Sequence, residues 1–183
     1  MSDGLFYLDT REPFIGTDIA AVTLASTAKA LYPASNFPVL GGQYFSRIGK
    51  KLRIRLFGRM TTGATPGNGS FNVYYGTGAD ANGVVLMTGT PAALTASQTN
   101  LSWMCEVFVH CRSIGSAGTL FCTGYGKFNE SLFAPMMFLP ASAPAVSGAC
   151  DLTASLIISV QFLRSGSTAE TMQVHDMEVT ALN

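Results

Sequence analysis

Charged residues are scarce in this sequence of 183 residues. They make up 12% of the chain, about half of the ~25% that is usual for a soluble domain. The eleven bases and eleven acids balance, so the formal net charge is zero. A chain without net charge has no overall field that would attract nucleic acid or an anionic membrane. We therefore expect neither as a partner, and we expect a surface that is rich in uncharged residues or covered by other proteins.

Long hydrophobic runs are also missing. No apolar run approaches the ~20 residues that a membrane-spanning helix needs. Residues 1–13 have neither the basic start nor the long apolar block of a signal peptide. The sequence thus predicts a protein that is made and used in a cytosol, or released from one by lysis.

The four cysteines are too few for a disulfide scaffold in a chain of this length. If residues 113–119 form a hairpin loop, Cys111 and Cys122 lie nearly opposite each other on adjacent strands. Opposed residues of an antiparallel pair are within disulfide range. The alternative, that both are small buried thiols, agrees better with a cytosolic protein.

Residue types that carry catalysis are few and are poorly placed for it. His175 is followed by Asp176, but consecutive residues of a strand point to opposite faces and do not pair easily. A metal site of His110, Cys111 and Cys122 meets the same obstacle, and no pair of carboxylates stands out as an acid and base. We predict no enzymatic activity, no metal and no cofactor.

Regular alternation of apolar and polar residues is the strongest signal that is present. In residues 51–60, Leu52, Ile54, Leu56 and Met60 fall on one parity, and Arg53, Arg55 and Arg59 on the other. This period of two is typical of a half-buried strand, which we place at the centre of a sheet. Residues 47–59 contain six of the eleven Lys and Arg residues, so its polar face is basic.

Other segments with the composition of strands follow, separated by Gly-rich turns. In residues 101–112, one parity holds Leu101, Trp103, Cys105, Val107, Val109 and Cys111, which we expect to face the core. Further strands are predicted at residues 71–75, 84–87, 119–128, 156–163 and 172–182. Residues 20–31 favour a strand more weakly, and residues 131–139 a bent or edge strand. Eight to ten strands without an amphipathic helix predict an all-β, two-sheet antiparallel sandwich, with a jelly roll as the favoured topology.

The N-terminal segment differs from the rest of the chain. Residues 1–19 hold four acids and the apolar cluster Leu5, Phe6, Tyr7 and Leu8, without a clear helix or strand pattern. We interpret residues 1–19 as an extended arm or lead-in that docks on another surface, with a frayed terminus as the alternative. Residues 20–183 are interpreted as a single β-sandwich domain.

Two interpretations of the basic strand face remain open. Arginines spaced by two along a strand can form bidentate pairs with the carboxylates of a partner. They can equally be the solvated side of an amphipathic strand, paired across the sheet with acids of the same domain.

From about residue 20 onward, the sequence resembles small virion structural proteins of tailed phages, especially phages of actinobacteria. The runs at residues 30–86, 111–128 and 164–183 carry this resemblance. It implies a jelly-roll protein that decorates the capsid or belongs to the minor tail proteins. It also implies a homotrimer bound to the major capsid protein on the capsid exterior of the virion, assembled in the host cytoplasm. The resemblance assigns no role to single residues.

The expected function is therefore that of a capsid decoration protein, which cements neighbouring capsomers and stabilises the particle. Leu5, Phe6, Tyr7 and Leu8 are the candidate gripping residues of the arm, and Arg53, Arg55 and Arg59 the candidate partners for acids on a neighbour. The alternative is a tail-associated or receptor-binding module that recognises a host-surface glycan. For that role Tyr74, Tyr75 and Tyr125 are the available aromatic residues, since we expect Trp103 to be buried.

Overall fold

The computed structural model describes residues 10–11, 19–37, 39–40, 42, 44–129, 136–143 and 145–182. Apart from a 3-10 turn at Ala34–Asn36, the regular elements in these residues are strands. They are β1 (Thr10–Arg11), β2 (Val22–Thr23), β3 (Lys29–Ala30), β4 (Lys51–Thr61), β5 (Asn68–Gly76), β6 (Val84–Thr88), β7 (Ala92–Ala93), β8 (Leu101–Ser113), β9 (Thr119–Phe128), β10 (Met137–Leu139), β11 (Ile157–Arg164) and β12 (Thr171–Ala181). No helix in this part of the chain is long and apolar enough to cross a membrane.

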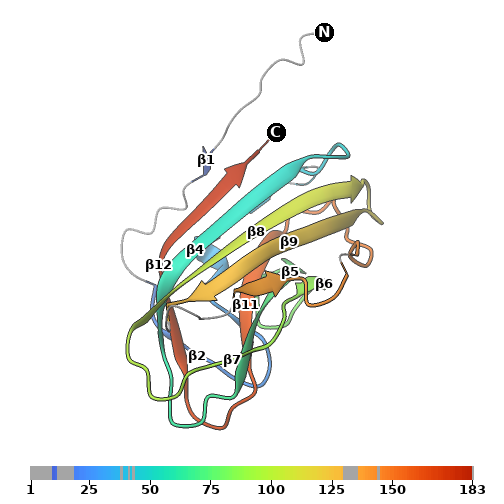
Figure 1. Ribbon diagram of the computed structural model, residues 1–183. Coiled ribbons are helices and arrows are strands. Elements are labelled where there is room, and N and C mark those ends of the chain that lie inside the picture. Colours follow the sequence, from blue (N-terminus) through green and yellow to red (C-terminus); the bar gives the residue numbers. More distant parts are fainter. Residues whose placement is uncertain are drawn as a thin grey trace.

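The strands form two antiparallel sheets that pack as a sandwich (Figure 1). The larger sheet has seven strands in the order β1-β12-β4-β8-β9-β10, with β2 also paired to β12. The smaller sheet has five strands in the order β3-β11-β5-β6, with β7 also paired to β5. The predicted all-β sandwich is thus confirmed, and the strand order is compatible with a jelly roll.

Alternating side chains explain why the larger sheet buries only one of its faces. Along β4, Leu52, Ile54, Leu56 and Met60 are at most 2% exposed, as predicted, while the residues between them are partly or fully exposed. The predicted core set of β8, including Trp103, is likewise buried. A pleated strand directs successive side chains to opposite faces, so these residues seal the core. The opposite face of β12, β4, β8, β9 and β10, which points away from the smaller sheet, is called the outer face below.

The weaker strand predictions hold only in part. Residues 20–31 contain two short strands, β2 and β3, instead of one long strand. Both pair at sheet edges, β2 with β12 and β3 with β11. Of residues 131–139, only β10 and the residue before it lie among the described residues, and β10 pairs with β9.

The register of the β8–β9 hairpin differs from the sequence prediction. Cys111 faces Leu120, and Cys122 faces Val109, so the two cysteines are diagonal neighbours and not opposed. A bulge between Cys111 and Ser113 shifts the pairing, and such an extra residue leaves no clear sequence signal. All four cysteines are buried and free, which agrees with the thiol interpretation.

The core between the sheets centres on Phe71 of β5. Its ring lies 4.9 Å from that of Phe162 and 5.6 Å from that of Trp103, measured between centroids. Gly126 of β9 faces this ring across the sandwich, and a Cβ atom built at Gly126 would lie 2.5 Å from Phe71 Cδ2 and Cε2. The absence of a side chain at Gly126 therefore allows the two sheets to approach at this point.

We expect Gly126→Ala to destabilise the protein by about 1–3 kcal/mol, because Phe71 is held by other rings and cannot move aside. The free energy of unfolding in urea measures this effect. Gly148→Ala is the matched control, since its added Cβ would meet only Val84 Cγ1, at 3.8 Å. Equal unfolding midpoints for the two variants would show that the core adapts to the extra methyl group.

Candidate interaction face

The outer face is the surface on which the candidate site is built. The strand registers align its residues in rows that cross β12, β4, β8 and β9, for example Glu178, Arg55, Glu106 and Tyr125. Six bases and three acids lie on it: Lys51, Arg53, Arg55, Arg59, Arg112, Lys127, Glu106, Asp176 and Glu178. The formal charge of this face is therefore positive, although that of the whole chain is zero.

A network of arginines and glutamates occupies the centre of the outer face. Arg53 Nη2 donates a hydrogen bond to Glu178 Oε1 at 2.5 Å, and Arg55 Nη1 donates to Glu178 Oε2 at 3.4 Å. The Nε atoms of both arginines lie 3.9–4.0 Å from Glu106 Oε1. Two acids on β12 and β8 thus flank the two arginines of β4 and hold them in place.

The acids of this network have further partners. Thr180 Oγ1 donates to Glu178 Oε1 at 2.6 Å, and this bond is the main cause that lowers the pKa of Glu178. Burial opposes the shift, while the hydrogen bond and charge of Arg53 support it. Tyr125 donates to Glu106, and this hydrogen bond raises the pKa of Tyr125. Both acids thus have partners within the chain, on either side of β4.

Aromatic side chains surround the network on the same face. Phe57, Phe108 and Phe121 are partly exposed, and Phe138 of β10 is 68% exposed. The guanidinium of Arg112 lies 4.6 Å from the ring centre of Phe121, and that of Arg55 lies 5.4 Å from that of Phe57. Outward aromatic rings in contact with cations are typical of surfaces that bind other proteins.

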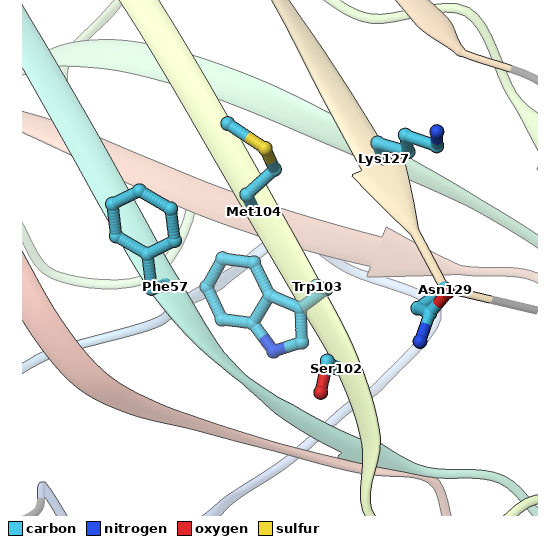
Figure 2. A pocket seen from close by; sticks show the side chains of 6 residues that line it. All are labelled: Phe57, Ser102, Trp103, Met104, Lys127 and Asn129. Atoms are coloured by element: carbon cyan, nitrogen blue, oxygen red, sulfur yellow. The ribbon is translucent and has the colours of Figure 1, made fainter.

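The outer face is hollowed at the end where β8 begins. The hollow has a volume of about 310 Å³ and is lined by Phe57, Ser102, Trp103, Met104, Lys127 and Asn129 (Figure 2). Phe57, Met104 and Lys127 belong to one row across β4, β8 and β9. The hollow therefore combines an apolar floor with a cation at its side, a setting that suits an apolar side chain next to an acid.

The structure separates the predicted site residues into three groups. Arg53 and Arg55 are paired with acids of the same chain, as the structural interpretation of the basic face expects. Arg59 is exposed, and its Nε donates to Gln173 Oε1 at 2.9 Å. Leu5, Phe6, Tyr7 and Leu8 lie outside the described residues.

The residues named for glycan recognition do not form a common site. Tyr75 is 3% exposed and Trp103 3%, so the predicted burial of Trp103 is confirmed. Tyr74 lies on β5 in the smaller sheet, whereas Tyr125 lies on β9 in the larger one. These tyrosines therefore do not converge.

Groups that carry metal or redox chemistry are not gathered in this part of the chain. No three of the described His, Cys, Asp and Glu residues are arranged to hold a metal ion. Burial raises the pKa of the Cys105 and Cys122 thiols, so both stay protonated at neutral pH.

The sequence prediction missed the hollow. The sequence does contain a signal for the hollow, because Phe57 and Met104 are apolar residues at positions of their strands that point outward. Alternation within one strand cannot show that they become neighbours, since that depends on the register between β4 and β8.

We expect Glu178→Gln to lower the free energy of unfolding by about 1 kcal/mol at pH 7, because the arginines lose a charged partner. The pKa of Glu178 is lowered in the folded protein, so the carboxylate stabilises the fold above its ordinary pKa of 4.5. This stabilisation is lost as the pH falls through the lower, folded value. Urea unfolding at several pH values should therefore show a difference from wild type at pH 7 that vanishes in acid.

Asp176→Asn is the control for this experiment, since Asp176 is exposed on the same strand and face. Its difference from wild type should be small at every pH. A Glu178→Gln difference that persists unchanged at low pH would contradict the role assigned to the carboxylate.

Comparison with known proteins identifies no relative of this chain. No family model matches its sequence, no curated protein matches it, and no solved structure matches it. The function is therefore argued from the fold and from the outer face.

Proposed function

We propose that this chain is a structural protein of a tailed-phage virion that decorates the capsid exterior and stabilises the particle. The observation that carries the proposal is the outer face, on which partly exposed aromatic rings surround a network of arginines and glutamates. A surface of this kind favours binding to other subunits over contact with water alone. The resemblance to phage virion proteins and the low charged fraction support the same function.

The mechanism is additive. Each subunit buries apolar area and pairs charges with its neighbours, and the many copies on a particle multiply a modest contact energy. The partner is the major capsid protein, and this protein binds it as a homotrimer. No catalytic group takes part in this function.

The second candidate is a tail-associated or receptor-binding module that recognises a host-surface glycan. The hollow on the outer face favours it, because an apolar floor beside a hydroxyl, an amide and an ammonium group is the usual chemistry of sugar binding. The two functions place the protein at different sites on the particle.

We expect cryo-electron microscopy of intact particles to show ordered copies on the capsid exterior, and particles that lack the protein to burst at a lower temperature. Deletion of residues 1–18 should abolish binding to such particles, while the far-ultraviolet circular dichroism of the sandwich is retained. A variant of the core, Gly126→Ala, is the control, since lower stability alone should leave binding intact at low temperature.

Copies confined to the tail would overturn the decoration function and favour adsorption. Binding of purified protein to a glycan array would then be the next measurement. Full binding to the capsid without residues 1–18 would overturn the role of the arm.

A further inference from the structure

The charges of the chain are divided between the outer face and the N-terminal segment. The outer face carries an excess of three positive charges, from the six bases and three acids named above. Residues 1–18 carry an excess of three negative charges, because four acids accompany one arginine. The remaining four bases and four acids cancel. The N-terminal segment thus carries the charge that complements the outer face.

This charge excludes the simplest occupant of the outer face. If two copies met with their outer faces in contact, six excess positive charges would lie in one interface, and like charges there oppose association. An acidic occupant with apolar side chains fits better, because the face offers both cations and aromatic rings. Residues 1–9 meet both requirements, since Asp3 and Asp9 flank Leu5, Phe6, Tyr7 and Leu8.

The hollow contains groups that match those of residues 1–9. Phe57 and Met104 offer apolar contact, Lys127 lines one side, and Arg59 pairs with Ser102, another lining residue. An apolar side chain that enters the hollow brings the acids of its segment close to the two cations. Anchors of this kind, an aromatic residue in a pocket beside charged groups, dominate the energy of many interfaces.

The direction of β1 indicates whether residues 1–9 bind the hollow of their own subunit or that of another copy. Thr10 pairs with Thr180 and Arg11 with Val179, antiparallel to β12. Followed from Arg11 back to Thr10, the chain therefore runs toward Ala181, whereas the hollow lies at the level of Asp176 and Gln173. Nine residues span at most about 30 Å, so residues 1–9 can extend up to that distance from Thr10. Docking in the hollow of the same subunit would instead require the chain to reverse its direction.

We infer that residues 1–9 of one copy bind the outer face of a second copy, with an apolar side chain in the hollow and the acids beside Arg59 and Lys127. The inference rests on the proposed assembly function and names the contact that joins the copies. It assigns residues 1–9 to a neighbouring subunit in place of a direct grip on the capsid, so that deletion of residues 1–18 lowers capsid binding by separating the copies, and it is tested without particles.

The test uses two full-length variants with opposite charge changes. The arm variant carries Asp3→Lys and Asp9→Lys, and the face variant carries Arg59→Glu and Lys127→Glu. Each alone brings like charges together at the contact, so sedimentation velocity should show self-association at least about tenfold weaker than that of wild type. In an equimolar mixture, the basic arm meets the acidic face and the acidic arm meets the basic face, so association should be restored.

Arg47→Glu is the matched control, since Arg47 is exposed and lies outside the outer face. It should self-associate like wild type, and added salt should weaken wild-type association. The inference is overturned if wild type is monomeric at all concentrations, if either variant associates like wild type, or if the mixture associates no better than its components. These outcomes are independent of where the protein lies on a particle, so the proposed function can fail separately.

Discussion

Burial of the Phe71 ring between the two sheets is the contact on which the rest of the structure depends. The ring packs against Trp103, Phe128 and Phe162, and reaches the backbone of the larger sheet at Gly126. Because one face of the larger sheet is committed to this core, alternation along each strand fixes which residues form the outer face. The residues of the outer face are therefore those that alternate with the buried residues along each strand.

The outer face combines partly exposed aromatic rings with paired charges. Arg53 and Arg55 form ion pairs with Glu106 and Glu178 of the same chain, although the Nε atoms of both arginines are buried without a hydrogen-bond partner. The exposed cations Arg59 and Lys127 and the hollow lie around these ion pairs, and they are the groups of the proposed contact.

The zero net charge of the chain results from two parts of opposite charge. The described domain keeps a local excess of positive charge on one surface, and residues 1–18 carry the opposite excess. A chain that is neutral as a whole thus has two parts of opposite charge, and these are the two sides of the proposed contact between copies. Contacts between unlike parts, in contrast to two-fold contacts, allow more than two copies to join.

The sequence by itself determined the strands with clear alternation, including β4 and β8, and the side of each that is buried, because the period of two reports burial directly. It also located the basic strand and the acidic segment. Only the tertiary structure decided the register of β8 with β9, in which Cys111 faces Leu120 and Cys122 faces Val109, next to a bulge between Cys111 and Ser113. It alone decided that Arg53 and Arg55 are paired internally and that Phe57 and Met104 meet at the hollow. Those outcomes depend on residues far apart in the chain, and local alternation holds no information on which strands become neighbours.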